Sequence, residues 1–260
     1  GRSLRELLRD LGTVPETLLR EIAFQIAEGV SAIHAEGIVH RDLKPENVLI
    51  TDDHRTRIMD LGVAKLQEAS VALTQEGQFA GSFLYAAPEQ FSGGEVGLRA
   101  DLYSIGVMLI ELATGQNPFQ HDDAGAVINA HLRTEPPRTA DLNAEYSQFF
   151  SELVATLLAK KPAERIDSSV ELVSLFDEGE KSEWWGAREK ELRTRRATLP
   201  KVTVRRDTDM HGRENEVALL RAAWDRAKEG YGNTILIEGE AGIGKTRLVD
   251  VLLRNLETED

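Results

Sequence analysis

The stretch covering residues 38–50 constrains the fold more than any other, because it places a polar loop between two short apolar segments. Its first two and last three residues are apolar and predict short buried strands. Between them the loop carries a carboxylate, Asp42, a cation, Lys44, and an amide, Asn47. A carboxylate can accept the proton of a hydroxyl group, and an amide carbonyl oxygen can bind Mg²⁺. The stretch therefore predicts a loop that handles a phosphate group.

Residues 40–47 read HRDLKPEN, which resembles the catalytic loop of the protein kinases. The resemblance implies that Asp42 is the catalytic base, that Lys44 meets the transferring phosphate, and that Asn47, also catalytic, binds the metal. A lysine at this position is similar to the Ser/Thr-directed kinases, so serine and threonine hydroxyls of proteins are the implied acceptors. ATP and Mg²⁺ are the implied cofactors, with Leu49 at the nucleotide site.

The tripeptide DLG at residues 60–62 resembles the D-F-G motif of the same family, with leucine in place of phenylalanine. It follows a predicted turn and return strand at residues 52–59. Asp60 lies thirteen residues past Asn47, which is the separation that a hairpin between two Mg²⁺ ligands requires. The resemblance implies that Asp60 is the second metal ligand and that Leu61 is an apolar plug under the site.

Residues 63–86 are polar and irregular and lead into the tripeptide APE at residues 87–89. This pattern resembles the activation segment of the kinases, in which Ser82 would contact Asp42 and Lys44. Arg41 and Lys65 could together receive a phosphate on Ser70 or Thr74. The alternative is a solvated loop without phosphorylation. The residues that this implies in regulation are the cations Arg41 and Lys65, the hydroxyls of Ser70 and Thr74, and Ser82.

Two helices are predicted before the loop. Ser3 and Glu6 are spaced as a capping box for a short helix that ends at Gly12. A longer helix runs from about Pro15 to Gly37, where the chain enters the loop. Its predicted buried stripe consists of Leu18, Leu19, Ile22, Ile26, Val30 and Ile33.

A later helix, from Asp101 to about Gly115, is apolar nearly all round and must therefore be central. The family resemblance implies that Asp101 pins the backbone of the catalytic loop. It also implies that Arg165 pairs with Glu89, a structural role. The kinase-like region then covers residues 1–177.

Residues 178–208 are mostly charged, acidic at first and then basic. A solvated linker is the favoured interpretation, and contact with an acidic surface or with nucleic acid is the alternative. Trp184 and Trp185 are expected to anchor the end of the last helix against the lobe.

A second phosphate motif occupies residues 239–246, which read GEAGIGKT and fit the P-loop pattern. A strand is predicted before it at residues 234–238, and a helix after it at residues 247–256. In such a loop backbone N–H groups and a lysine meet the phosphates, and a hydroxyl meets Mg²⁺. The residues concerned are Gly239, Gly242, Gly244, Lys245 and Thr246. With the upstream motif and helix between His211 and Lys228, this resembles the entry to AAA-like and signalling ATPase domains.

Composition excludes some classes of protein. The net charge of −13 argues against nucleic-acid binding, which needs a basic face. The absence of cysteine excludes a disulfide framework and a thiolate metal site, and fits a cytoplasmic location. No apolar run is long enough to predict a membrane segment.

We therefore expect a mainly α fold. A kinase large lobe with short β-hairpins would cover residues 1–177, a charged linker residues 178–208, and the beginning of an α/β P-loop ATPase domain residues 209–260. The chain is expected to be an internal part of a bacterial signalling protein, without the small lobe and inactive by itself. The predicted function is a Ser/Thr protein kinase, with ATP at two sites in the intact protein. The alternative is a nucleotide-dependent signalling or transcriptional regulator in which the kinase-like domain is a scaffold.

Overall fold

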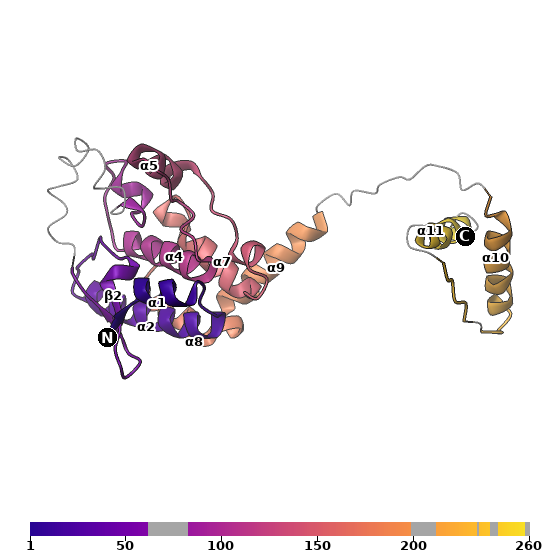
Figure 1. Cartoon of the computed structure of the whole chain (residues 1–260), viewed down its shortest axis with the longest axis horizontal. Helices are drawn as coiled ribbons and strands as arrows, with labels where there is room; N and C mark the ends of the chain where they lie inside the picture. The colour runs from indigo at the N-terminus through magenta and orange to yellow at the C-terminus, as the bar shows by residue number, and fades with distance from the viewer. Residues whose placement is uncertain (62–82, 199–211, 233, 240–243, 258–260) are drawn as a thin grey trace. The chain divides into compact units, whose positions relative to one another are not determined.

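The computed structural model describes residues 1–61, 83–198, 212–232, 234–239 and 244–257. They belong to two compact units, Gly1–Thr198 and Leu199–Asp260, each with its own internal packing (Figure 1). The first unit is mainly helical with few strands, as the sequence predicts. None of the described helices is both long and apolar enough to cross a lipid bilayer.

A small antiparallel sheet holds one end of the candidate loop. It consists of β1 (Arg2–Ser3), β2 (Val48–Ile50) and β3 (Thr56–Ile58), in the order β1-β2-β3. The predicted hairpin is confirmed, because Val48 pairs with Ile58 and Ile50 with Thr56. The predicted strand at residues 38–39 is wrong: these residues belong to no strand, and Ile38 is 39% exposed. The described residues pair β2 with β1 on one side and with β3 on the other, and residues 38–39 pair with neither.

Two helices lead to the loop. In α1 (Leu4–Leu11), the predicted capping box is present, since Ser3 N–H donates to the Glu6 carboxylate and Glu6 N–H to Ser3 Oγ. The second helix, α2 (Glu16–Ala35), buries one face against the core. The predicted stripe is corrected at two positions, because Leu18 is 42% exposed and Ile33 is only half-buried. The buried face of α2 consists of Leu19, Ile22, Ala23, Ile26, Ala27, Val30 and His34.

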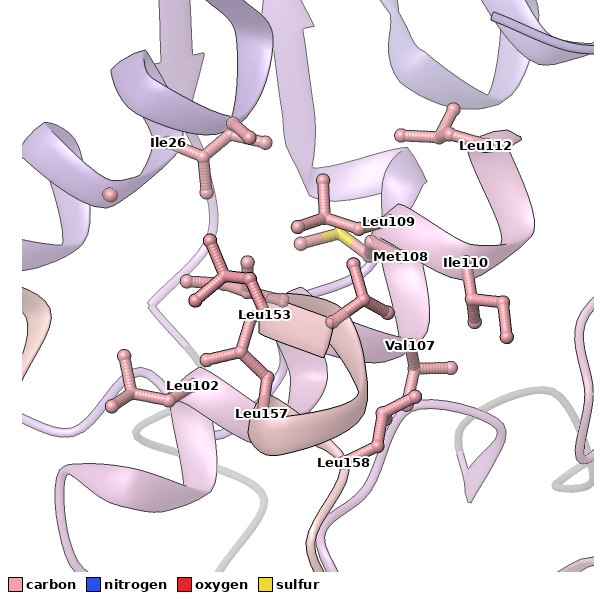
Figure 2. Packing of buried hydrophobic residues seen from close by; sticks show 14 of the residues in the cluster. Ile26, Leu102, Val107, Met108, Leu109, Ile110, Leu112, Leu153, Leu157 and Leu158 are labelled. Carbon is pink, nitrogen blue, oxygen red and sulfur yellow. The ribbon is translucent and has the colours of Figure 1, made fainter. Parts of the chain in front are cut away.

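The central helix is α4 (Arg99–Thr114), and it is buried along almost its whole length, as predicted. It ends at Gly115, whose left-handed backbone (φ 78°) closes the helix. It packs closely on α7 (Gln148–Leu157), because a Cβ added to Gly106 would lie 2.9 Å from the Leu157 Cβ. Figure 2 shows side chains of both helices meeting in the core, together with Ile26 from α2.

The other elements of the first unit surround this core. Of these, α8 packs along α2, and η1 forms the far side of the candidate loop. Their bounds are η1 (Pro45–Asn47), η3 (Pro88–Gln90), α5 (Ala124–Arg133), α6 (Thr139–Leu142), η4 (Pro162–Glu164), α8 (Ser169–Glu178) and η5 (Gly179–Lys181).

A further helix, α9 (Glu183–Thr198), continues the first unit beyond the predicted limit at residue 177. Trp185 is 8% exposed, and its ring meets that of Phe149 edge-on at 5.8 Å. Arg188 Nε donates to Glu152 at 2.9 Å. The segment expected to be a solvated linker therefore begins with a packed helix, because its tryptophans provide an apolar face despite the surrounding charge.

The described part of the second unit contains α10 (Glu214–Lys228) and α11 (Lys245–Glu257), which pack against each other. Both helices agree with the sequence prediction to within two residues at each end. The strand predicted at residues 234–238 is absent from the structure, and Leu236 is 80% exposed. A strand needs a hydrogen-bonded neighbour, and the described residues of this unit contain no other strand.

Candidate active site

Asp101, in the first turn of α4, holds the backbone of the candidate loop. Its side chain is fully buried, and it accepts hydrogen bonds from the backbone N–H groups of His40 at 2.8 Å and Arg41 at 2.9 Å. The same carboxylate lies 2.8 Å from His34 Nε2. A buried carboxylate is stable only when donors surround it, and two of these donors belong to the residues just before Asp42. The predicted role of Asp101 is therefore confirmed.

The backbone at Arg41 is in the left-handed region, with φ 65°. For a residue other than glycine this conformation costs about 1–3 kcal/mol and persists only where its surroundings hold it. Hydrogen bonds hold both sides: Asp101 accepts from Arg41 N–H, and His40 Nδ1 accepts from Asp42 N–H at 3.3 Å. His40 is itself fixed, because its Nε2 lies 3.1 Å from the Met59 carbonyl oxygen. The loop conformation is thus set by the fold before any substrate binds.

The three predicted catalytic residues lie together. Asp42 Oδ2 accepts from Lys44 Nζ at 3.0 Å and from Asn47 Nδ2 at 3.1 Å. Asn47 Nδ2 also donates to the backbone carbonyl oxygen of Asp42 at 2.8 Å, which closes the loop. The Asp42 side chain is 11% exposed and that of Lys44 22%, so both lie at the surface of the site without projecting from it.

The proposed metal ligands, Asn47 and Asp60, lie at the same end of the β2–β3 hairpin: Asn47 directly precedes β2, and Asp60 lies two residues beyond β3. Met59 N–H donates to the backbone carbonyl oxygen of Asn47 at 2.8 Å and extends the ladder of β2 and β3 by one bond. This bond places Asp60 one residue beyond the partner of Asn47. Both hydrogen bonds of the Asn47 side chain are made by its nitrogen Nδ2, so its side-chain oxygen Oδ1 is the atom that could bind a cation. An amide oxygen beside a carboxylate is a donor set that suits Mg²⁺.

Two apolar residues, Leu49 and Leu61, were predicted to lie at the site. Leu49, expected at the nucleotide site, lies half-buried in β2 between Ser3 and Arg57. Leu61, expected as an apolar plug, is 47% exposed. The left-handed backbone at Asp60 (φ 54°) ends the extended run of β3, and Leu61 follows it away from the core.

A charged network that the sequence did not predict joins the loop to the central helix. Arg5 Nε donates to Glu46 at 2.7 Å, and Arg5 Nη1 donates to Glu111 at 2.8 Å. Arg5 Nη2 also contacts the Tyr85 hydroxyl, which in turn donates to Glu111 at 2.5 Å. Burial and the nearby Glu111 carboxylate raise the pKa of the Tyr85 phenol, so it stays a donor at neutral pH. Arg5 thereby connects α1, η1, residue 85 and α4.

No motif marks Arg5 in the sequence, because its partners lie far away along the chain. The available signal was the apolar helix at residues 101–115, which carries a second acid, Glu111, besides Asp101. A buried acid of this kind requires a partner cation.

The predicted pair between Glu89 and Arg165 is confirmed. Two parallel bonds of 2.7 Å join the guanidinium to the carboxylate, and the Arg165 side chain is fully buried. Arg165 also donates to the carbonyl oxygen of Arg99 at 2.9 Å. The pair ties η3 and the loop after η4 to the start of α4.

Four of the residues predicted to regulate the site lie outside the described residues: Lys65, Ser70, Thr74 and Ser82. The fifth, Arg41, is described, and its Nε is buried without a hydrogen-bond partner in the described part of the chain. Phosphorylation of the segment that contains Ser70 and Thr74 stays a prediction.

The P-loop residues are described only in part, since Gly242 lies outside the described residues. Lys245 begins α11, and its Nζ donates to the Gly239 carbonyl oxygen at 2.8 Å across the loop. Gly244 has φ 95°, which favours glycine, and Thr246 is exposed on the first turn of α11. A lysine and a hydroxyl at a helix N-terminus can meet a phosphate and its Mg²⁺.

Comparison with known families gives two matches. Residues 1–175 match the protein kinase domain, and residues 210–259 match an AAA ATPase domain. The kinase match contains all the described residues of the candidate loop, of the Glu89–Arg165 pair and of Asp101.

Similar curated proteins are bacterial. The chain is 40% identical over 172 residues to serine/threonine-protein kinase drp72 of Corynebacterium efficiens, covering 66% of this chain and 32% of that protein. It is 36% identical over 170 residues to serine/threonine-protein kinase PknL of Mycobacterium tuberculosis, covering 65% of this chain and 42% of PknL. It is 37% identical over 172 residues to serine/threonine-protein kinase PknH of Mycobacterium bovis, covering 66% and 29%. The chain thus spans about a third of the length of the curated relatives it matches.

Proposed function

The chain belongs to the protein kinase family, and we propose that it transfers the γ-phosphate of ATP to serine and threonine hydroxyls of proteins. The observation that carries the proposal is the meeting of Asp42, Lys44 and Asn47 on a backbone that Asp101 holds in place. The names of the similar bacterial proteins support the choice of serine and threonine as acceptors.

Asp42 would accept the proton of the attacking hydroxyl. Lys44 and Asn47 both donate to its Oδ2, so the carboxylate has a fixed direction before the substrate arrives. Phosphoryl transfer depends mainly on positioning and on charge stabilisation, and a carboxylate held in this way does not have to reorganise during the reaction.

Lys44 would carry the charge that the transferring phosphate needs. Its ammonium has three donors, so it can hold Asp42 Oδ2 and a phosphate oxygen at the same time. It would therefore keep the base and the phosphate on the two sides of one cation. The side chain is 22% exposed, which gives it access to both.

Asn47 and Asp60 would hold Mg²⁺ through an amide and a carboxylate oxygen. When bound, Mg²⁺ would neutralise charge on the phosphates. The bond from Met59 N–H to the Asn47 carbonyl oxygen keeps the two ligands in register. Leu49 is proposed to lie against the nucleotide.

We further propose that the protein is a multidomain signalling protein of the cytoplasm, where ATP is available. Its kinase-like part would be joined through the charged segment to a P-loop ATPase module with its own ATP and Mg²⁺. The match of residues 210–259 to an AAA ATPase domain supports this module. Protein substrates would be its partners.

The proposal is tested by measuring transfer of radiolabelled phosphate from ATP to a protein substrate with the purified full-length protein. Asp42→Asn removes the proton acceptor and keeps the size and hydrogen-bonding positions of the side chain. We expect kcat to fall about 10²–10⁴-fold. The label should be recovered on serine or threonine.

The matched control is Asp52→Asn, in the turn of the β2–β3 hairpin. The Asp52 side chain is 100% exposed, so the substitution changes the same charge without touching the site. It should leave kcat unchanged. If Asp42→Asn transfers phosphate as fast as Asp52→Asn, Asp42 is not the base and the proposed function is wrong.

A further inference from the structure

A chain of three buried side chains runs from α8 to the candidate loop. Ser169 Oγ lies 3.1 Å from His34 Nδ1, and His34 Nε2 lies 2.8 Å from Asp101 Oδ2. The exposed fractions are 2% for Ser169, 9% for His34 and 0% for Asp101. The three residues come from α8, α2 and α4, which are distant in the sequence.

The order of these side chains is that of a hydrolase triad, but the burial excludes nucleophilic attack by Ser169. A nucleophile must reach a substrate, and Ser169 is enclosed in the first turn of α8. Asp101, moreover, already accepts from the backbone N–H groups of His40 and Arg41. The row Ser169–His34–Asp101 therefore supports the backbone and has no chemistry of its own.

The directions of the two hydrogen bonds follow from Asp101, which is an acceptor at one end of the row. The Asp101 carboxylate can only accept, so His34 Nε2 must donate to it. In a neutral imidazole the other nitrogen is then an acceptor, and the Ser169 hydroxyl is the donor that it faces. Two hydrogen bonds on opposite sides of the ring fix the orientation of His34, which a single bond to Asp101 leaves free to tilt.

The backbone that Asp101 holds, at the end of this row of hydrogen-bonded side chains, is under strain. Arg41 has φ 65°, and its N–H group is held by Asp101 Oδ1 at 2.9 Å. A shift of the Asp101 carboxylate would release this residue, and Asp42 follows it directly. In a reaction that depends on positioning, a misplacement of about 1 Å can lower the rate about 10²-fold.

We propose that Ser169 is a positioning residue for phosphoryl transfer, acting through His34 and Asp101 on the backbone that carries Asp42. The proposal rests on the function proposed above. Because Ser169 is only 2% exposed, it would not touch a bound substrate or nucleotide itself.

The neighbouring Ser168 offers a matched control. It is the N-cap of α8, and its hydroxyl accepts from Glu171 N–H at 3.1 Å. Ser168→Ala and Ser169→Ala each remove one hydroxyl from the start of the same helix, but only Ser169 contacts His34. A loss of α8 stability alone would therefore affect both variants.

The test uses the full-length protein and two readouts. The first is steady-state phosphate transfer, in which Ser169→Ala should lower kcat about 2- to 30-fold. Its KM for ATP should stay unchanged, because Asn47 and Asp60 keep their contacts. Ser168→Ala should leave both parameters as in the wild type.

The second readout is hydrogen exchange of the peptide that contains residues 38–42, followed by mass spectrometry. Ser169→Ala should speed exchange of the His40 and Arg41 amides, because their acceptor has lost its support. Ser168→Ala should not. Equal exchange and equal kcat in the two variants, whether both are slowed or both are unchanged, overturn the proposal.

The two readouts separate this proposal from the proposed function. If the wild type transfers no phosphate, the proposed function fails, and the exchange comparison still shows whether Ser169 holds the loop. If the wild type is active and Ser169→Ala has wild-type kcat and exchange, only the role of Ser169 is refuted.

Discussion

At the scale of single residues, backbone strain gathers where the site is. Three described residues other than glycine have positive φ, and two of them, Arg41 and Asp60, are part of the candidate site. The third, His54, lies in the hairpin turn, where such a conformation is ordinary. Asp101 holds Arg41, and the bond from Met59 N–H to Asn47 fixes the residue before Asp60. The fold thus maintains positive φ at two positions of the candidate site.

The first prediction at this scale concerns Asp60. Asparagine tolerates the left-handed backbone and keeps an oxygen, whereas alanine loses both advantages. We expect Asp60→Asn to lower phosphate transfer by at least about 10²-fold, because a carboxylate ligand of Mg²⁺ is lost. The free energy of unfolding should change by less than about 1 kcal/mol, since Asp60 is exposed. Initial rates against Mg²⁺ concentration and urea unfolding measure the two effects.

Asp60→Ala distinguishes the effect of losing the metal ligand from the effect on the backbone. If charge is what matters, alanine and asparagine should reduce the rate to a similar extent. A rate for Asp60→Asn close to that of the wild type would mean that Asp60 does not bind the metal.

The sequence could predict those site residues whose partners lie close to them along the chain. Asp42, Lys44 and Asn47 lie within six consecutive positions, so their spacing alone indicates their meeting. Arg5 and Ser169 act on partners more than forty residues away, and no pattern links them in one sequence. Such contacts depend on how the helices pack, which periodicity does not determine.

At the scale of elements, the same distinction separates α1 from α9. The capping box of α1 is a local signal, and the structure has it where the sequence predicts it. The sequence of α9 is dominated by charge, which indicated a linker, yet the helix packs through a few apolar residues against α7. The predicted strand before the P-loop shows the opposite error, since an apolar run alone does not provide a neighbouring strand.

The prediction for α9 concerns Trp185. Its ring is almost fully buried against Phe149, so Trp185→Ala should lower the free energy of unfolding of the first unit by about 3 kcal/mol. Urea unfolding followed by far-ultraviolet circular dichroism measures the change.

Arg193→Ala is the control on the same helix. Arg193 is 75% exposed and pairs with Glu189 on the surface, so its loss should cost less than about 0.5 kcal/mol. If Trp185→Ala is as mild as Arg193→Ala, α9 contributes nothing to the stability of the first unit, and the favoured boundary returns to residue 177.

At the scale of the whole molecule, two motifs that are predicted to handle phosphate occur in one chain and in separate compact units. In the first, the carboxylate of Asp42 is in hydrogen-bond contact with a cation, Lys44, and an amide, Asn47, on a supported loop. A scaffold without catalysis would not need this arrangement, which favours the enzyme over the alternative of a regulator with an inactive kinase-like domain. In the second, Lys245 closes the P-loop onto Gly239.

The last prediction asks whether the two units act independently. In the full-length protein Lys245→Ala should abolish nucleotide binding at the P-loop, because backbone N–H groups alone face a multiply charged phosphate without a cation. Phosphorylation of a peptide should stay within a few-fold of the wild type, since that chemistry uses Asp42, Lys44, Asn47 and Asp60. Asp42→Asn should do the reverse. Lys228→Ala, at the end of α10, is the control in the same unit and should change neither activity. Loss of peptide phosphorylation in Lys245→Ala, with Lys228→Ala active, would show that nucleotide at the P-loop is required for the kinase reaction and that the units are coupled.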